Sequence, residues 1–179
     1  MLNEKNEFDI QVKDNFLNKK DFEKVINYMK TIQWNAKDLH YEQDTPEHHW
    51  FNKDCPKEIS DIILKEVIKF FKVKILKESL CQYTFVSKSE KNQIHNDAGD
   101  RLNFQIILYL EGDQNIHCGT GFYSKKQDNS FELNTHIGFK PNRVVSWVSN
   151  VYHAPLNFTD DFKSRKSIIA QYLVKEIRC

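Results

Sequence analysis

The sequence lacks a charge excess and any long apolar run, and each absence excludes a class of protein. Lys and Arg number 26 against 25 Asp and Glu, so at a net charge of +1 there is no clear signal for nucleic acid or an anionic membrane. No apolar run approaches the roughly 20 residues of a membrane helix, and the opening residues lack the apolar core of a signal peptide. We therefore expect a cytoplasmic protein without a membrane partner.

Paired cysteines are also absent. Cys55, Cys81, Cys118 and Cys179 are scattered singly, with neither the C-x-x-C pairs of a zinc site nor the density of a secreted scaffold. Repeats, linkers and low-complexity segments are missing as well. With 40% hydrophobic and 28% charged residues, the 179 residues predict one soluble globular domain over the whole chain.

Helical patterns dominate the first part of the chain. Residues 7–13 alternate like an edge strand, and the segment after them has Phe22, Val25, Ile26 and Met29 at helical spacing. A polar stretch over 32–54, with the aromatic HHWF at 48–51, is either a short strand or a loop. A second helix starts at Pro56 with an apolar face. We expect helical support over about 14–76.

Short apolar and aromatic runs separated by turn residues fill the rest of the chain. The runs are LCQYTFVSK, RLNFQIILYLE, GTGFYS, FELNTHIGF, RVVSWV and KSIIAQYLVKE. Strands at this spacing are typical of an all-β sandwich or barrel. The sequence thus predicts a β core over about 80–176.

One H-x-D motif stands just after a predicted strand. His95 and Asp97 are alternate residues, so in an extended segment both side chains project from the same face. His153, which ends the strand-like run RVVSWVSNVYH, could supply a third ligand. Two histidines and one carboxylate on one face of an octahedral ion are the arrangement of Fe(II) oxygenases.

Arg165 opens the final predicted strand, 12 residues beyond His153, and Ser167 follows on the same face. The planar guanidinium fork suits a bidentate grip on a carboxylate, and a neighbouring hydroxyl can add a donor. Together the two residues suit the far carboxylate of a dicarboxylic co-substrate.

The order H-x-D, distal His and R-x-S resembles the double-stranded β-helix oxygenases that use Fe(II) and 2-oxoglutarate, with O2. RLNFQIILYLEGDQNIHCGTGFYS and PNRVVSWVSNVYH also resemble the prolyl hydroxylase branch, over roughly residues 80–175. The resemblance implies an α+β fold whose jelly-roll, cupin-like core is supported by N-terminal helices. It also implies a 2-oxoglutarate-dependent dioxygenase that hydroxylates a C–H bond.

The resemblance suggests further co-substrate residues. A tyrosine on the strand before H-x-D often helps to hold 2-oxoglutarate in such enzymes, and Tyr83 matches it, with Tyr109 as a second candidate. The chain departs from the prolyl hydroxylases in having Arg165 where they have Lys, which argues against a protein-proline substrate.

Asn103 and Gln105 interrupt the apolar run LNFQIILYL at alternate positions, so one face of that strand is partly polar. This face either meets solvent or lines the cavity, where an amide such as Asn103 could bind the co-substrate. The remaining histidines make poorer candidates for metal ligands. His117 and His136 lack a carboxylate two residues on, and His40 lies in an irregular segment. His48 and His49 are adjacent, so on a strand they would point to opposite faces. We interpret all five as ordinary surface or structural residues.

The substrate is not specified by these motifs, and a small metabolite or amino-acid-like molecule is our expectation. Two alternatives remain open. The chain could be a metal-binding β-sandwich sensor without turnover, or a cupin-like dioxygenase without 2-oxoglutarate. Arg165 and Ser167 argue against the cupin-like enzyme, since a carboxylate anchor has no purpose without the keto acid.

Overall fold

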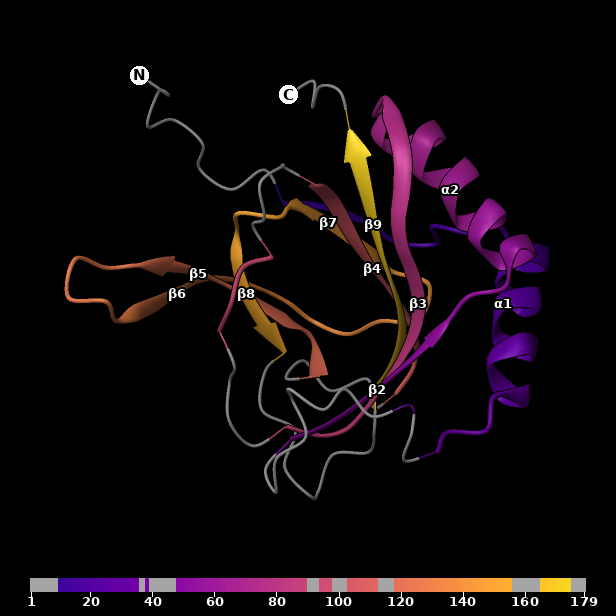
Figure 1. Cartoon of the computed structure of the whole chain (residues 1–179), viewed down its shortest axis with the longest axis horizontal. Coiled ribbons are helices and arrows are strands. Elements are labelled where there is room, and N and C mark those ends of the chain that lie inside the picture. The colour runs from indigo at the N-terminus through magenta and orange to yellow at the C-terminus, as the bar shows by residue number, and fades with distance from the viewer. Residues whose placement is uncertain are drawn as a thin grey trace.

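The computed structural model describes residues 10–35, 38, 48–89, 94–97, 103–112, 118–155 and 165–174. Strands and two helices alternate along the first half of the chain, and strands alone follow (Figure 1). In chain order the elements are β1 (Gln11–Lys13), α1 (Lys19–Thr31), β2 (His48–Asp54), α2 (Lys57–Phe71), β3 (Ile75–Ser89), β4 (Asn103–Glu111), β5 (Thr120–Lys125), β6 (Phe131–Ile137), β7 (Val144–Val148), β8 (Tyr152–Pro155) and β9 (Arg165–Val174).

The strands form two antiparallel sheets. The larger sheet has the order β1-β7-β4-β9-β3-β2, and the smaller has the order β6-β5-β8. Both helices lie on the face of the larger sheet that points away from the smaller one, and the β5–β6 hairpin projects on the opposite side of the molecule (Figure 1). This arrangement is an α+β fold, as predicted.

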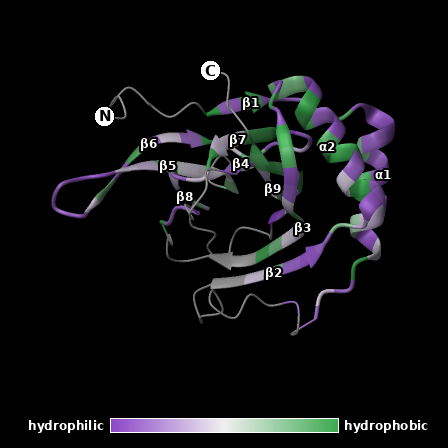
Figure 2. Ribbon diagram, turned by 45° about the horizontal axis from the view of Figure 1, so that its top comes forward, coloured by the Kyte–Doolittle hydropathy of each residue, from purple (hydrophilic) through white to green (hydrophobic). Residues whose placement is uncertain are grey.

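Each helix has a local signal at its start and an apolar stripe toward the sheet. Asn18 caps α1 by accepting a hydrogen bond from the backbone N–H of Asp21 at 3.0 Å. Pro56 precedes α2, and Lys72 ends it in a left-handed conformation with φ of 55°. Hydrophobic stretches alternate with hydrophilic ones along both helices, whereas the tip of the β5–β6 hairpin is hydrophilic (Figure 2).

The core has two parts, one on each face of the larger sheet. One part packs the helices on the sheet and contains Phe104, Ile106 and Leu108 of β4. The other part lies between the two sheets and contains Ile107 and Tyr109 of the same strand. Because alternate residues of a strand face opposite ways, β4 is buried on both faces. Its nearly continuous apolar sequence follows from that position.

The six predicted strand runs coincide with β3, β4, β5, β6, β7 and β9, and the strand-or-loop segment at 48–51 is part of strand β2. Two boundaries differ from the prediction. Strand β3 begins at Ile75, inside the range assigned to helical support, because it pairs with the end of β9. The run that ends at His153 divides at Ser149 and Asn150 into β7 and β8, which belong to different sheets.

Across the described ranges, we find no helix with the length and apolarity of a membrane span.

Candidate metal centre and pocket

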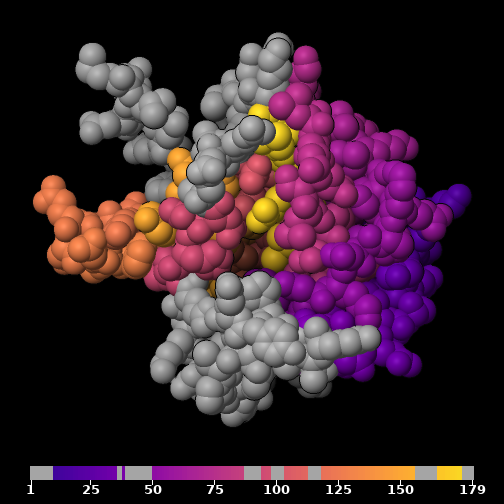
Figure 3. All heavy atoms as spheres, viewed as in Figure 1, coloured from indigo at the N-terminus to yellow at the C-terminus, as the bar shows by residue number. Residues whose placement is uncertain are grey.

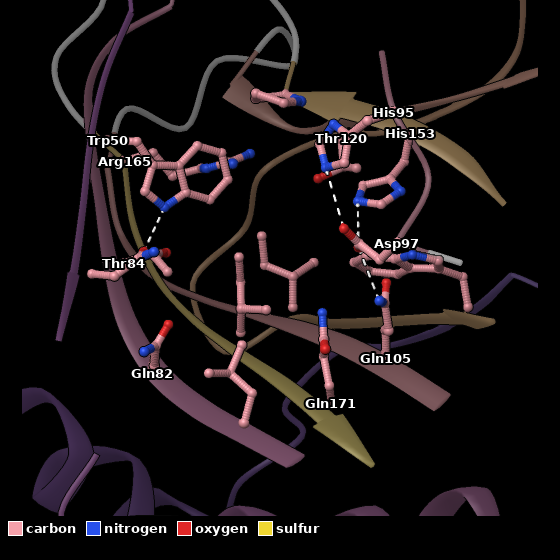
Figure 4. A pocket seen from close by; sticks show the side chains of 16 residues that line it. Trp50, Gln82, Thr84, His95, Asp97, Gln105, Thr120, His153, Arg165 and Gln171 are labelled. Atoms are coloured by element: carbon pink, nitrogen blue, oxygen red, sulfur yellow. Dashed lines mark hydrogen bonds and ion pairs between the residues drawn. The ribbon is translucent and has the colours of Figure 1, made fainter. Parts of the chain in front are cut away.

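A pocket of about 150 Å³ lies between the two sheets. In the space-filling view a hollow is visible near the middle of the molecule, beside β9 (Figure 3). Strands of both sheets and the segment around His95 contribute side chains to it (Figure 4). The lining residues are Trp50, Asn52, Leu80, Gln82, Thr84, His95, Asp97, Gln105, Ile107, Thr120, Trp147, His153, Pro155, Arg165, Ile169 and Gln171.

The three predicted metal ligands meet at one side of this pocket. His95 forms a backbone bridge to His153 of β8, with N–H to carbonyl distances of 3.1 and 2.8 Å. The backbone N–H of Asp97 donates to the carbonyl of Ser149 at 2.9 Å. The short segment that carries the motif is therefore fixed to the smaller sheet and to the turn between β7 and β8.

The ligand atoms of these residues converge. His95 Nε2 lies 3.7 Å from Asp97 Oδ1, and His153 Nε2 lies 3.5 Å from Asp97 Oδ2. One ligand atom from each residue can be chosen so that all lie within 4.8 Å of one another. Atoms that each bind a first-row metal at roughly 2 Å are separated by up to about 4 Å, so small side-chain adjustments would close the triad on one ion. The residues fit a single metal ion.

Burial and a hydrogen bond prepare His153 for this role. Desolvation, together with the proximity of His95, lowers the pKa of His153 to about 4. The imidazole is therefore neutral at physiological pH, as a metal ligand must be. Its Nδ1 lies 3.0 Å from the carbonyl oxygen of Val151, so the proton belongs on Nδ1 and Nε2 is directed at Asp97.

Gln105 supports the carboxylate. Its Nε2 donates a hydrogen bond to Asp97 Oδ2 at 2.9 Å, while Gln105 itself is 1% exposed on strand β4 (Figure 4). Trp147 of β7, the cross-strand partner of Gln105, has its ring centroid 4.8 Å from that of His153. On the partly polar face of the LNFQIILYL run, Gln105 and Ile107 line the cavity. At these positions the face meets the cavity and not solvent.

Arg165 lies at the other end of the pocket, at the start of β9. Its side chain is buried, and Nη1 donates to the carbonyl of Gly119 at 2.7 Å. Burial lowers the pKa of the guanidinium. Arginine nevertheless stays protonated in proteins, so this end of the pocket carries a desolvated positive charge. Trp50 lies beside it (Figure 4).

Two hydroxyl pairs flank Arg165. The Oγ atom of Ser167 lies 2.7 Å from Thr84 Oγ1, and Thr84 lines the pocket. The Tyr109 hydroxyl lies 2.7 Å from Thr120 Oγ1, and the Arg165 guanidinium carbon is 5.7 Å from the Tyr109 ring centroid. Ser167 and Tyr109 thus lie next to the pocket, each in contact with a hydroxyl that lines it.

The structure does not bring Tyr83 to the pocket. Its side chain packs in the core beneath the helices, and its hydroxyl donates to the carbonyl of Val25 in α1 at 3.0 Å. The neighbouring Gln82 and Thr84 face the pocket instead. Asn103 lies at the start of β4, where its backbone N–H donates to Ser149 Oγ at 3.0 Å, and its side chain is not part of the lining.

Several lining residues were not assigned to the site from the sequence. Trp50 lies in the stretch left as strand or loop, and Gln171 lies inside an apolar run. The alternation of side chains along each strand was the signal that could have identified such residues. Gln105 is two residues from Asn103 and Gln171 is six from Arg165, so each shares a strand face with a predicted site residue.

Of the remaining histidines and cysteines, those with described side chains are His136, Cys55, Cys81 and Cys118. The last three are free thiols. His136 lies on β6, in the smaller sheet. His40, His117 and Cys179, and the side chains of His48 and His49, lie outside the described part.

Comparison with known proteins gives a match at the level of structure. No protein-family model and no curated protein sequence matches the chain. A prolyl hydroxylase from Trichoplax adhaerens, in complex with a hypoxia inducible factor oxygen degradation domain peptide fragment, has a TM-score of 0.63 at 14% identity, covering 92% of this chain and 83% of that one.

Two further structures show the same likeness. A Pseudomonas putida prolyl-4-hydroxylase has a TM-score of 0.55 at 11% identity, covering 95% of each chain. HygX from Streptomyces hygroscopicus, with nickel, 2-oxoglutarate and hygromycin B bound, has a TM-score of 0.62 at 12% identity, covering 93% of this chain and 83% of that one. The fold is therefore the one shared by these oxygenase structures. This confirms the predicted double-stranded β-helix.

Proposed function

We propose that this protein is an Fe(II)- and 2-oxoglutarate-dependent dioxygenase that hydroxylates a C–H bond of a small molecule. The observation that carries the proposal is the placement of two features in one pocket. His95, Asp97 and His153 converge at one side, and the buried cation Arg165 lies at the other. A metal triad and a carboxylate anchor are the two parts that this chemistry needs from the protein.

The triad residues would hold Fe(II), which supplies the activation of O2 for C–H oxidation when it is bound. The chain itself contributes the ligand geometry. Asp97 offsets part of the charge of the ion, and Gln105 keeps its carboxylate in place through the 2.9 Å hydrogen bond. His153 presents an unprotonated Nε2, because burial keeps the ring neutral and its one proton belongs on Nδ1, beside the Val151 carbonyl.

Arg165 would bind the far carboxylate of 2-oxoglutarate. Its positive charge is desolvated inside the pocket, where an ion pair is stronger than at the surface. Thr84, Thr120 and the hydroxyls behind them, Ser167 and Tyr109, can add hydrogen-bond donors around that carboxylate. In this role Ser167 and Tyr109 act mainly by orienting the threonine hydroxyls that line the pocket.

The substrate would occupy the part of the pocket that the co-substrate leaves. Apolar side chains such as Ile107 and Ile169 also line the pocket and limit the access of water to the reacting groups. The size of the pocket, about 150 Å³, favours a small molecule or a single side chain of a larger one.

An anaerobic titration tests this proposal. The protein is loaded with Fe(II) and 2-oxoglutarate is added while the visible spectrum is recorded. We expect the metal-to-ligand charge-transfer band of a chelated keto acid, followed in air by slow formation of succinate. A band without succinate under any condition would favour the metal-binding sensor, and the absence of both would favour a cupin-like site without 2-oxoglutarate.

A further inference from the structure

Three pocket residues lie in one row across adjacent strands, near the metal triad. Trp147 of β7 is the cross-strand partner of Gln105 in β4, and Gln105 is the partner of Gln171 in β9. Directly opposed residues of antiparallel strands point to the same face, with Cβ atoms about 5 Å apart. The row therefore presents an indole and two amides to the cavity. The two amides, of Gln105 and Gln171, lie side by side in Figure 4.

Polar atoms of this row have no hydrogen-bond partner within the described part of the chain. Gln105 Oε1 and Trp147 Nε1 are both buried and unpaired. Gln105 is 1% exposed, and its Nε2 is already used by Asp97. A buried acceptor and a buried donor without partners are costly, so such a pair points to a ligand that completes them.

The other two amides of the pocket behave differently. Asn52 Oδ1 accepts a hydrogen bond from Trp50 Nε1 at 2.6 Å, and Gln82 Nε2 donates to Asp54 Oδ1 at 2.8 Å. For the Gln171 amide, in contrast, the described residues provide no such bond, although it lines the same cavity. Gln171 thus offers both a donor and an acceptor beside the unpaired oxygen of Gln105.

The row is separated from Arg165 along the strands. Arg165 and Gln171 are six residues apart on β9, so their Cα atoms are about 20 Å apart at about 3.3 Å per residue. In the proposed function the co-substrate would bind Arg165 at one end and the metal at the other, so only its metal-binding end would come near Gln105. The amide of Gln171, on the neighbouring strand, is not assigned to the co-substrate and remains available to a second molecule.

Charge limits what this second molecule can be. The ionisable lining residues among those described are His95, Asp97, His153 and Arg165. The proposed function already assigns all of them to the metal and the co-substrate. A charged group placed at the row would be desolvated without an opposite charge, which is unfavourable.

We propose that Gln171, Gln105 and Trp147 form the substrate-recognition row, and that the part of the prime substrate beside the metal is neutral and both donates and accepts hydrogen bonds, as a carboxamide or an alcohol does. This inference rests on the proposed function. Gln171 is its specificity-determining residue, because Gln105 is shared with Asp97.

The test uses four small probes and a metal that reports proximity. Protein loaded with Mn(II) and 2-oxoglutarate is mixed in turn with acetamide, ethanol, acetate and ethylammonium, and the proton relaxation enhancement of each probe is measured by NMR. Gln171→Leu removes the amide, and Gln127→Leu, in the exposed turn between β5 and β6, is the matched control. For each probe we compare the part of the relaxation enhancement that is lost in Gln171→Leu. An enhancement that arises from direct binding of the probe to Mn(II) does not depend on Gln171 and is removed by this comparison.

We expect acetamide or ethanol to show a Gln171-dependent enhancement, about tenfold weaker binding in Gln171→Leu, and no change in Gln127→Leu. A response to acetamide alone would identify a carboxamide, and a response to ethanol alone an alcohol. Gln171→Glu should shift the preference to ethylammonium, because it places a carboxylate in the row.

Either of two results would overturn the inference. One is a Gln171-dependent enhancement for acetate or ethylammonium as large as for the neutral probes. The other is no Gln171-dependent enhancement for any probe. Binding of 2-oxoglutarate to the wild type, measured in the same samples, distinguishes failure of the recognition row from failure of the proposed function. If the keto acid binds and the probes fail, only the recognition row is wrong, whereas loss of keto acid binding would contradict the proposed function itself.

Discussion

Gln105 Nε2 donates a hydrogen bond to Asp97 Oδ2 at 2.9 Å, so a buried residue of the larger sheet orients the carboxylate of the H-x-D segment. That segment is otherwise attached to the smaller sheet through the bridge between His95 and His153. The contact therefore links the two sheets at the proposed metal centre. It also gives Gln105 a function beyond lining the cavity.

Replacing Gln105 with Leu should weaken metal binding. The carboxylate would lose its donor while the volume of the side chain is nearly kept, and partners of this kind typically contribute about 10- to 100-fold in metal affinity. Calorimetric titration with Mn(II) measures the change. Gln82→Leu is the control, because Gln82 lines the same pocket but is bonded to Asp54. Equal Mn(II) affinity in wild type and Gln105→Leu would contradict this role.

Replacing Asp97 with Ala should abolish tight metal binding and 2-oxoglutarate turnover while sparing the fold. The Asp97 side chain is 32% exposed and stands outside the strands, so its loss should change stability little. Metal content and succinate formation measure the first effect, and thermal unfolding measures the second. Asp61→Ala, on the exposed side of α2, should leave both unchanged. A variant with wild-type iron content and turnover would show that Asp97 is not a ligand.

The triad was predictable because its pattern is local. The i, i+2 spacing places His95 and Asp97 on one face without any knowledge of the sheets, and His153 was a candidate because it ends a strand-like run. In a longer strand, the face on which each side chain lies could not be predicted in this way. Tyr83 and Thr84 are adjacent on β3, so an assignment that is wrong by one residue selects the side facing the helices.

The position of the recognition row could not be predicted from the sequence either. Gln105 and Gln171 stand in runs that are otherwise apolar, and a polar residue there is compatible with solvent on one face or with a cavity. Only the packing of the smaller sheet against β4 and β9 decides between them. Trp147 likewise has two roles. Its side chain is 3% exposed and packs in the core between the sheets, and it also lines the pocket.

A pH-dependent contribution to stability is expected from Asp14, which ties the segment after β1 to the turn before β7. Hydrogen bonds from Arg143, and also from Lys140, lower the pKa of Asp14 to about 2 from 3.8. Because the folded pKa is the lower one, the stabilisation is complete above about pH 4 and is lost as the pH falls toward 2. The side chain is 35% exposed, so the effect should be modest and weaker in salt.

Thermal unfolding of wild type and Asp14→Asn between pH 6 and pH 2 measures this contribution. The wild type should have the higher melting temperature at pH 6, and the difference should shrink below about pH 4. A difference that stays constant down to pH 2 would mean that the charge of Asp14 contributes nothing.

Arg165 separates a 2-oxoglutarate enzyme from a generic metal-binding sandwich. Removing one partner of a buried charge pair typically costs about 2 to 5 kcal/mol, because the remaining carboxylate is desolvated and unpaired. At about 1.4 kcal/mol per tenfold, Arg165→Ala should weaken 2-oxoglutarate binding by about 30-fold to several thousandfold. Arg165→Lys should recover only part of the loss, since an ammonium lacks the planar two-pronged fork.

Calorimetric titration of 2-oxoglutarate into anaerobic protein, with Mn(II) in place of iron, measures these affinities. Lys166→Ala is the matched control, because Lys166 is the next residue of β9 and its Nζ pairs with Glu111 on the opposite face, 2.7 Å away. Metal affinity should change much less than co-substrate affinity in Arg165→Ala, since the guanidinium and the triad lie at different ends of the pocket. If Arg165→Ala bound 2-oxoglutarate as tightly as Lys166→Ala does, the carboxylate anchor would lie elsewhere, and the sensor and cupin-like alternatives would then explain the metal triad better.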